Sequence, residues 1–198
     1  DPHINPKKNV RPFAYDHFGQ LWMADFLHGP KLFNGKKKHK TYLHIILDDS
    51  SRFIVHGGFY LTESVEPLIY DLMGAVRSFG IPQRFYVDNG AAYISRDLKI
   101  LCARNGIDLV HSPPFQPQGR GKSERLFRTV RDQFLCDKFK TVKQMNDAFK
   151  IWVSRYHKTI HSSLNCSPLQ KRLQTKNVCR VLSPSTDIEA LFDDTGSS

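Results

Sequence analysis

Three acidic residues have the type and the setting to do chemistry: Asp25, Asp88 and Glu124. Asp25 ends the run LWMAD, Asp88 lies in FYVDNG, and Glu124 lies in GKSERLF, with thirty-five residues between the second acid and the third. Three carboxylates gathered in one place repel each other, so a fold that brings them together needs a cation among them. Oxygen donors without a thiolate or imidazole partner suit Mg²⁺ or Mn²⁺. The three acids therefore indicate metal-assisted phosphoryl transfer.

Two such ions about 3.5–4 Å apart can clamp both oxygens of an in-line displacement at a phosphate. Asp25 is the best candidate to bridge them, because a strand is the most rigid support. Taken singly, each acid has an ordinary explanation: Asp25 as a turn or cap residue, Asp88 as part of an Asp-Asn-Gly turn, and Glu124 as a partner of a helix N-terminus. Their joint occurrence in a basic setting favours function.

The charge is strongly positive, with 29 Lys and Arg against 19 Asp and Glu, a net charge of +10 and a pI near 9.5. Such a charge can serve solubility alone. However, the cations cluster in the KKK run at 36–38 and again around Glu124. The second cluster consists of Arg120, Lys122, Arg125, Arg128 and Arg131. This clustering favours a nucleic acid as the partner.

Several classes of protein are disfavoured by the sequence. No apolar run approaches the roughly 20 residues of a transmembrane helix, and the N-terminal residues lack a signal-peptide pattern, so we expect no membrane partner and a reducing, cytoplasmic location. The four cysteines are far apart without a CxxC pair, which argues against a cysteine-built zinc site. His157 and His161 have i, i+4 spacing but no evident third ligand, so packing or capping is favoured for them.

The elements that must position the three acids follow from periodicity and turn signals. Strands are predicted over residues 20–27, 41–47, 52–61, 84–87 and 107–111. Helices are predicted from Thr62 to about 79, over 95–105, from Ser123 onward, over about 142–156, and shortly after Pro168. This order predicts an α/β fold, a mixed five-stranded sheet flanked by helices, with the three acids at one edge.

The remaining segments are predicted to be irregular. Residues 29–40 read as a basic turn, 112–122 as an exposed and mobile loop, and the tail from Ser183 as frayed. Asp48 and Asp49 end the second predicted strand, and a salt bridge to Arg52 is the default expectation for them.

Residues of about 20 to 170 resemble the catalytic core of retroviral-type integrases and of the DDE transposases of bacterial insertion elements. The matching stretches are LWMADF, ILDDSSRFIV, FYVDNGAAY, HSPPFQPQGRGKSERLFRTV and YHKTIHSSLNCSPLQ. The resemblance implies an RNase H-like fold and a catalytic, metal-binding triad of Asp25, Asp88 and Glu124 that holds two Mg²⁺ or Mn²⁺ ions with substrate. The implied reactions are 3′-end cleavage and strand transfer in transposition.

The same resemblance implies partners and boundaries. The partners are the DNA of the element ends and of the target, with a homo-oligomer assembled on them, in a bacterial cytoplasm and near the nucleoid. Residues 1–19 would be an arm or linker, 20–170 the core, and 171–198 a C-terminal extension or interdomain linker. Contacts to DNA would come from Asn89, Gln118, Gly119, Arg120, Lys122, Arg125 and Arg128.

Two other functions stay open at this point. An RNase H-like nuclease also uses a carboxylate cluster with Mg²⁺, but usually has four acids and no PQGxGxxE-like loop. A non-catalytic, domesticated DNA-binding module is the other alternative, and the three intact acids argue against it. The chain also departs from the family pattern at Thr159 and Ile160, where relatives often carry Arg-Pro.

Overall fold

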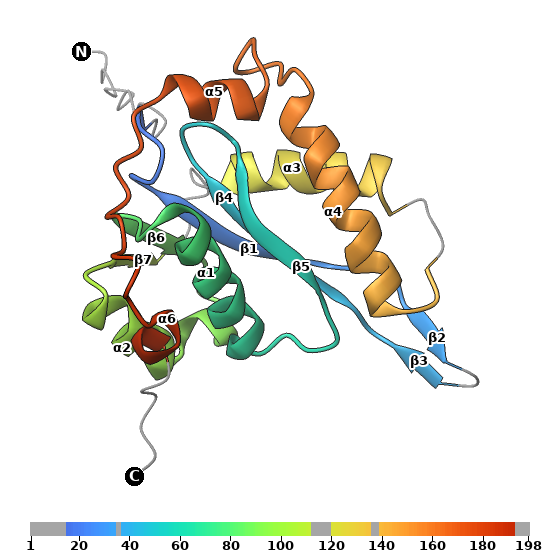
Figure 1. Cartoon of the computed structure of the whole chain (residues 1–198). Helices are drawn as coiled ribbons and strands as arrows, with labels where there is room; N and C mark the ends of the chain where they lie inside the picture. Colours follow the sequence, from blue (N-terminus) through green and yellow to red (C-terminus); the bar gives the residue numbers. More distant parts are fainter. Residues whose placement is uncertain (1–14, 35–36, 112–119, 136–138, 193–198) are drawn as a thin grey trace, which may run out of the picture.

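A computed structural model describes residues 15–34, 37–111, 120–135 and 139–192. Its centre is a five-stranded sheet in the order β5-β4-β1-β6-β7 (Figure 1). The strands are β1 (Trp22–His28), β4 (Tyr42–Asp48), β5 (Ile54–Tyr60), β6 (Arg84–Val87) and β7 (Asp108–His111). β4 pairs antiparallel with β1 and β5, whereas β6 is parallel to β1 and to β7. The predicted mixed five-stranded sheet is confirmed.

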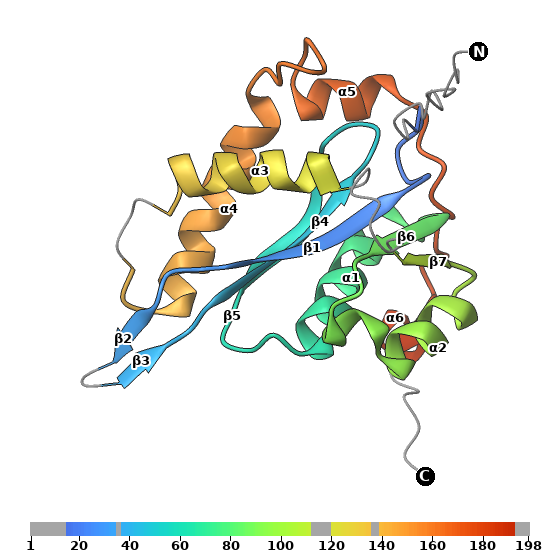
Figure 2. The same cartoon turned by 180° about the vertical axis from the view of Figure 1, so that it is seen from behind.

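Helices pack on both faces of this sheet. The helices are α1 (Val65–Phe79), α2 (Arg96–Arg104), α3 (Arg120–Gln133), α4 (Val142–Lys158), α5 (Pro168–Gln174) and α6 (Ile188–Phe192). α1 presents its apolar residues to the sheet at i, i+4 and i+7 through Leu68, Leu72 and Ala75, all buried. Seen from behind, in Figure 2, α3 crosses in front of α4 and runs alongside β1.

Alternation along β1 separates two hydrophobic cores. Trp22 and Ala24 belong to the core on the α1 side, while Met23 and Leu27 belong to the core that includes the buried residues of α3 and α4. Since successive side chains of a strand point to opposite faces, Asp25 lies on the same face as Met23 and Leu27. That face is the one covered by α3.

Some helix and strand limits differ from those predicted. Helix α1 is preceded by Ser64 as its N-cap residue rather than Thr62. Helix α3 begins at Arg120 rather than at Ser123, despite Gly121 in its first turn. The tail from Ser183, predicted to be frayed, contains α6. Residues 112–119 of the loop predicted over 112–122 lie outside the described residues.

The predicted basic turn contains a β-hairpin, formed by β2 (Leu32–Asn34) and β3 (Lys37–His39). The sequence signal for it was the glycine of Asn34-Gly35, because Gly35 is the first of the two positions between the paired residues Asn34 and Lys37, where glycine favours a tight hairpin turn. The three lysines that follow have low strand propensity and obscured this signal.

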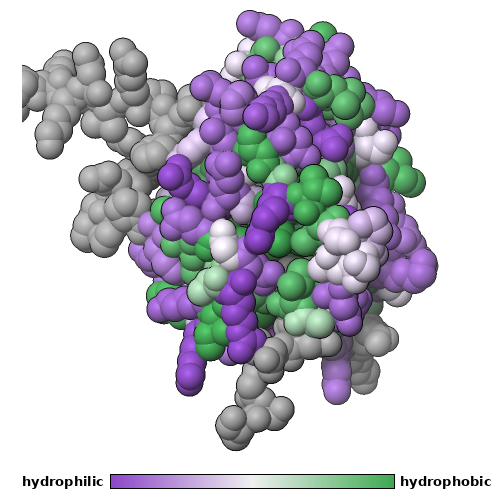
Figure 3. Space-filling view, turned by 60° about the vertical axis from the view of Figure 1, so that its left-hand side comes forward, coloured by the Kyte–Doolittle hydropathy of each residue, from purple (hydrophilic) through white to green (hydrophobic). Residues whose placement is uncertain are grey.

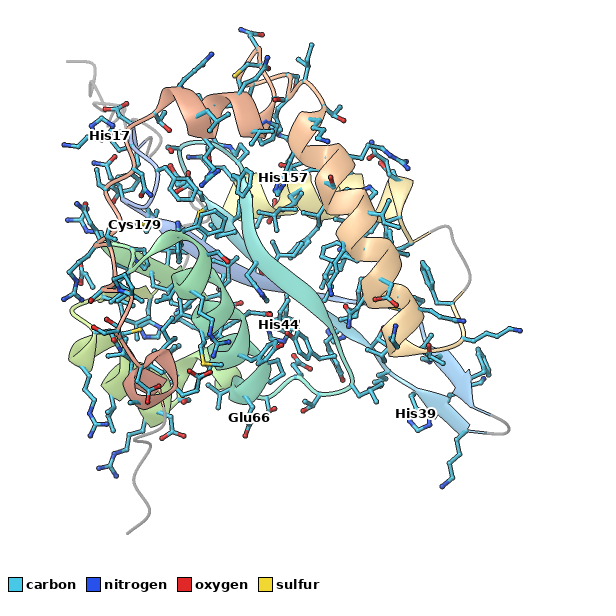
Figure 4. The ribbon with its side chains drawn as sticks, viewed as in Figure 1. His17, His39, His44, Glu66, His157 and Cys179 are labelled. Atoms are coloured by element: carbon cyan, nitrogen blue, oxygen red, sulfur yellow. The ribbon has the colours of Figure 1, made fainter. Side chains whose placement is uncertain are left out.

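Residues near both ends of the described chain pack against the first core. Phe18 is fully buried in the first core and forms a bridge with Asn177, and Ile81 forms another with Arg180. Cys179 is buried beside them (Figure 4). The packed body thus includes residues before 20 and after 170, and the predicted limits 1–19, 20–170 and 171–198 stay a prediction.

The outer surface shows no continuous apolar belt on the face drawn in Figure 3, where hydrophilic and hydrophobic residues are interspersed. Within the described ranges, no helix has both the length and the apolar character needed to cross a bilayer.

Candidate active site

The register between β1 and β6 brings the first two acids together. The two strands are parallel, with Trp22 opposite Phe85 and Met23 opposite Tyr86. Two residues further in the same register, Asp25 faces the position of Asp88, and neighbouring strands lie about 4.8 Å apart. Asp25 and Asp88 therefore lie side by side at the end of β6.

Backbone amides orient both carboxylates. The carboxylate of Asp25 accepts a hydrogen bond from the backbone N–H of Phe26 at 2.8 Å. The carboxylate of Asp88 accepts one from the backbone N–H of Gly90, also at 2.8 Å, which closes an Asx-type turn. A Cβ atom at Gly90 would lie 2.9 Å from Asp88 Oδ1, so glycine is needed for this close approach. Asp88 therefore forms the turn expected from its Asp-Asn-Gly sequence, and such a turn is compatible with a catalytic role.

Tyr93 packs behind these two acids. Its side chain is fully buried, with its ring centroid 6.0 Å from that of Phe26. Burial raises the pKa of Tyr93 well above its usual value, and the negative charges of Asp25 and Asp88 raise it further. The phenol therefore stays protonated, and both carboxylates act on the same side chain. The sequence reasoning did not single out Tyr93, although it lies in the matching stretch FYVDNGAAY.

Glu124 lies on α3, next to the buried stripe of that helix formed by Leu126, Phe127 and Val130. Helix α3 packs against β1 on the face that carries Asp25. Glu124 itself is exposed. Among the described residues, no group of three or more His, Cys, Asp or Glu side chains is placed to hold a metal ion. The structure thus brings Asp25 and Asp88 together and leaves Glu124 on the adjacent helix.

Lys122 forms a buried ion pair at the start of α3. Its Nζ lies 2.6 Å from Asp49 Oδ1, and the two side chains are 18% and 2% exposed. Burial lowers the pKa of Lys122, and the charge and hydrogen bond of Asp49 oppose that shift. Since Asp49 follows β4, the pair ties the first turn of α3 to the central sheet. Lys122 was predicted to contact DNA; its ammonium pairs with Asp49 in this structure, and DNA contact by Lys122 stays a prediction.

The predicted salt bridge from Asp48 or Asp49 to Arg52 is wrong. The ion-pair partner of Asp49 is Lys122, and Arg52 acts on the two acids only as a more distant charge. Asp48 accepts hydrogen bonds from the backbone N–H of Gly19 and from Ser51, which compensate its burial. These bonds lower the pKa of Asp48, whereas desolvation raises it and is the larger effect.

The other predicted DNA contacts are placed only in part. Asn89 is exposed beside Asp88, and Arg125 and Arg128 are exposed on α3. Gln118 and Gly119 lie outside the described residues, as does the side chain of Arg120. DNA contact by any of these residues stays a prediction.

The histidines of the YHKTIHSSL stretch have structural partners, as predicted. The ring of His157 stacks on Phe53 with centroids 3.7 Å apart (Figure 4). One ring nitrogen of His157 accepts the backbone N–H of Ile54 at 3.1 Å. His161 Nδ1 accepts the backbone N–H of Ser163 at 3.3 Å. Packing and local capping therefore account for both.

The model of the family described as integrase core domain matches residues 16–117 of this chain. The chain belongs to the integrase core domain family. It is 31% identical over 135 residues to the Gag-Pro-Pol polyprotein of sheep pulmonary adenomatosis virus, covering 68% of this chain and 7% of that protein. It is 32% identical over 108 residues to the transposase for transposon Tn552 of Staphylococcus aureus, covering 49% of this chain and 22% of that protein. The chain thus spans a small part of the length of these relatives.

Solved structures of integrase cores share the fold. The catalytic core domain of BIV integrase superposes with a TM-score of 0.62 at 17% identity, covering 79% of this chain and 95% of that one. The HTLV-2 integrase catalytic core, solved in complex with magnesium, gives a TM-score of 0.60 at 19% identity, covering 82% and 99%. The predicted RNase H-like architecture is confirmed.

Proposed function

We propose that this integrase core domain is the catalytic core of a DDE-type polynucleotidyl transferase. It would cleave DNA at 3′ ends and join those ends to target DNA in transposition. The observation that supports this most is the parallel register of β1 and β6, which sets Asp25 beside Asp88, the residue directly after β6, in a member of this family. Glu124 is the third acid, on a helix packed against the same face.

The donors at this site fit a hard divalent cation. Asp25 and Asp88 would hold Mg²⁺ or Mn²⁺, joined by Glu124, because all three offer carboxylate oxygens. Two such ions, when bound with substrate, activate the attacking water or 3′-hydroxyl and neutralise the leaving oxygen. The amides of Phe26 and Gly90 keep the first two carboxylates oriented. A cation bound by Asp25 and Asp88 would also attract the carboxylate of Glu124. Without a cation, the negative charges of the two aspartates repel that carboxylate.

The proposed partners are DNA and further copies of the chain. The net charge of +10 suits a polyanion. Among the structural neighbours are dimeric and trimeric forms of the HTLV-2 core and an intasome of a simian T-cell lymphotropic virus. We propose an assembly of several copies on DNA for this chain, because two element ends must be joined in one reaction.

The decisive experiment replaces Asp88 by Asn, which keeps the side-chain shape and removes the charge. We expect Mn²⁺-dependent nicking of plasmid DNA to fall about 100-fold or more, since a metal ligand is removed. Binding to a duplex in a gel-shift titration should stay unchanged. Asp108→Asn is the matched control, because Asp108 lies on the neighbouring strand β7 and is exposed. Full nicking by Asp88→Asn would overturn the site assignment.

A second experiment reads metal binding without catalysis. Mn²⁺ should raise the melting temperature of the protein, because a ligand at about 100 times its Kd stabilises a fold by roughly 2.7 kcal/mol. Asp25→Asn and Asp88→Asn should lose this shift, and Glu124→Gln should reduce it. Asp132→Asn, on the exposed surface of α3, is the control. An equal shift in all four variants would show that Mn²⁺ binds elsewhere.

A further inference from the structure

The β2–β3 hairpin and its flanking residues, 29–34 and 37–40, form a projection that we call the basic arm. β2 and β3 make a two-stranded sheet of their own, with Leu32 opposite His39 and Phe33 opposite Lys38. Figures 1 and 2 show this hairpin extending from the end of the β1–β4 ribbon, away from the sheet and its helices. A segment placed this way is available to a large partner.

One face of the basic arm is cationic. Because side chains alternate along a strand, Phe33 and Lys38 share a face, and two positions further the same face carries Lys31 opposite Lys40. All four side chains are exposed, and Phe33 is exposed by 60%. The Nζ atom of Lys38 lies 5.5 Å from the centroid of the Phe33 ring. Like charges directly opposite each other are unfavourable in a hairpin unless an anion lies between them.

The base of the arm is held firmly. The backbone N–H of Gly29 donates to the carbonyl of Thr41 at 2.8 Å, and the Thr41 hydroxyl donates to the carbonyl of Pro30 at 2.7 Å. A Cβ atom on Gly29 would lie 2.3 Å from Thr41 Oγ1, so a larger residue does not fit there. Leu32, on the opposite face from Lys31, Lys38 and Lys40, is buried in the second core. The cationic face is therefore presented at a fixed position relative to β1.

The arm also lies within reach of a duplex held at the Asp25–Asp88 pair. Leu32 lies seven positions beyond Asp25 along the chain, so the two are at most about 23 Å apart at about 3.3 Å per residue. DNA rises about 3.4 Å per base pair, so this limit corresponds to at most about seven base pairs. A two-stranded ribbon fits the width of a DNA major groove, with lysines placed to meet phosphates on its walls.

We propose that the basic arm is a second DNA-contacting surface, separate from the residues around Glu124. It binds the backbone of duplex DNA within about seven base pairs of the phosphate at the Asp25–Asp88 pair. The position relative to that phosphate rests on the proposed function. The affinity of the arm for duplex DNA does not depend on it. The sequence between Gly29 and Lys40 contains no Asp or Glu, so nothing acidic on the arm itself opposes the phosphates.

The test measures the salt dependence of binding. The arm variant is Lys31→Ala/Lys38→Ala/Lys40→Ala, and the control variant is Lys150→Ala/Lys158→Ala/Lys176→Ala, three exposed lysines outside the arm. Affinity for a duplex of random sequence, about 25 base pairs long, is followed by fluorescence anisotropy between about 50 and 200 mM KCl. The slope of log K against log salt falls by about 0.9 for each phosphate that the protein no longer neutralises. We expect the arm variant to neutralise two to three fewer phosphates, and to bind about 10- to 100-fold more weakly at low salt.

The control variant should stay within about twofold of the unmodified protein. Equal slopes and affinities for the arm and control variants would overturn the proposal, whether or not the nicking assay supports the DDE site. Conversely, a reduced slope in the arm variant together with full nicking by Asp88→Asn would retain the arm and overturn the catalytic site. The single change Lys38→Gln, which should reduce the slope by about 0.9, serves if the triple variant is unstable.

Discussion

Two basic regions of this molecule, the basic arm and the first turn of α3, use the same residue type in opposite ways. Lys38 on the arm stands exposed beside Phe33. Lys122 at the start of α3 is mostly buried and paired with Asp49. One lysine is available to meet a phosphate, while the other joins the helix that carries Glu124 to the central sheet. Clustering of cations in a sequence therefore does not identify the cations that bind DNA.

The physical difference lies in solvation. A buried carboxylate such as Asp49 is strongly destabilising without a cation beside it. Among the described residues, removal of Lys122 would leave Asp49 with only the backbone N–H of Tyr15 and the more distant charge of Arg52. On the exposed arm, water and salt screen each ammonium, and an ion pair there would contribute at most about 1 kcal/mol. Lys122 thus positions α3, whereas Lys38 lies on the arm that we propose contacts DNA.

The largest difference between the two regions should appear in stability. Lys122→Met should lower the free energy of unfolding by about 3 kcal/mol, because Asp49 stays buried and unpaired. Lys38→Met should change it by less than about 0.5 kcal/mol, as for most surface substitutions. Urea denaturation followed by tryptophan fluorescence measures both. Equal effects of the two substitutions would contradict the distinction.

Burial also affects how the stability of the protein depends on pH, through the histidine His44. His44 on β4 is buried, and neither of its ring nitrogens has a hydrogen-bond partner among the described residues (Figure 4). Burial lowers the pKa of His44 from 6.5 to about 4. The unfolded chain therefore binds a proton on this imidazole at a higher pH than the folded protein does. The burial of neutral His44 therefore contributes fully to the stability of the fold above pH 6.5, and this contribution diminishes as the pH falls toward about 4.

His44→Phe should remove that pH dependence while keeping a ring against Phe26, whose centroid lies 5.9 Å away. We expect the decrease in stability between about pH 7 and pH 4 to shrink by about 3 kcal/mol, measured by urea denaturation at several pH values. His157 has its pKa lowered to about 4 by burial too, so part of the dependence will remain. An unchanged pH profile would show that His44 is not buried as described.

A double-mutant cycle isolates the Lys122–Asp49 pair. Asp49→Asn combined with Lys122→Met should be less destabilising than the sum of the two single changes, by about 1–2 kcal/mol, because the double variant leaves no unpaired charge. The same cycle between Lys122 and Asp108, which lies on β7, should be additive within about 0.5 kcal/mol. Additivity in both cycles would mean that the pair is not coupled.

The smallest expected effect concerns the ring on the arm. Phe33→Ala should leave the free energy of unfolding within about 0.5 kcal/mol of the unmodified protein, since the side chain is 60% exposed. Phe149→Ala, in the second core, should cost about 3–5 kcal/mol. A large decrease in stability from Phe33→Ala would mean that the ring supports the hairpin rather than facing a partner.

Much of the fold was predictable, because local patterns agree with it. The strand that carries Asp25 alternates between two cores, and Ser95 caps α2 by accepting the backbone N–H of Leu98. The hairpin at 32–39 was missed because its lysines weigh against a strand, although Gly35 indicates a tight turn. The start of α3 was placed too late, because Gly121 is unfavourable in a helix interior.

The three acids of the candidate site were predicted from their residue type, their spacing and the strands that flank them. All of this information can be read from the sequence without the fold. Which lysine pairs and which is exposed depends on chain segments that are far apart in sequence. Lys122 and Asp49 are 73 residues apart, and they meet only because α3 crosses the end of β4. Burial and ion pairing are properties of the folded packing, since the free energy of a charge depends on what surrounds it. The amino-acid pattern therefore determined where the acids stand, and three-dimensional packing determined what each lysine does.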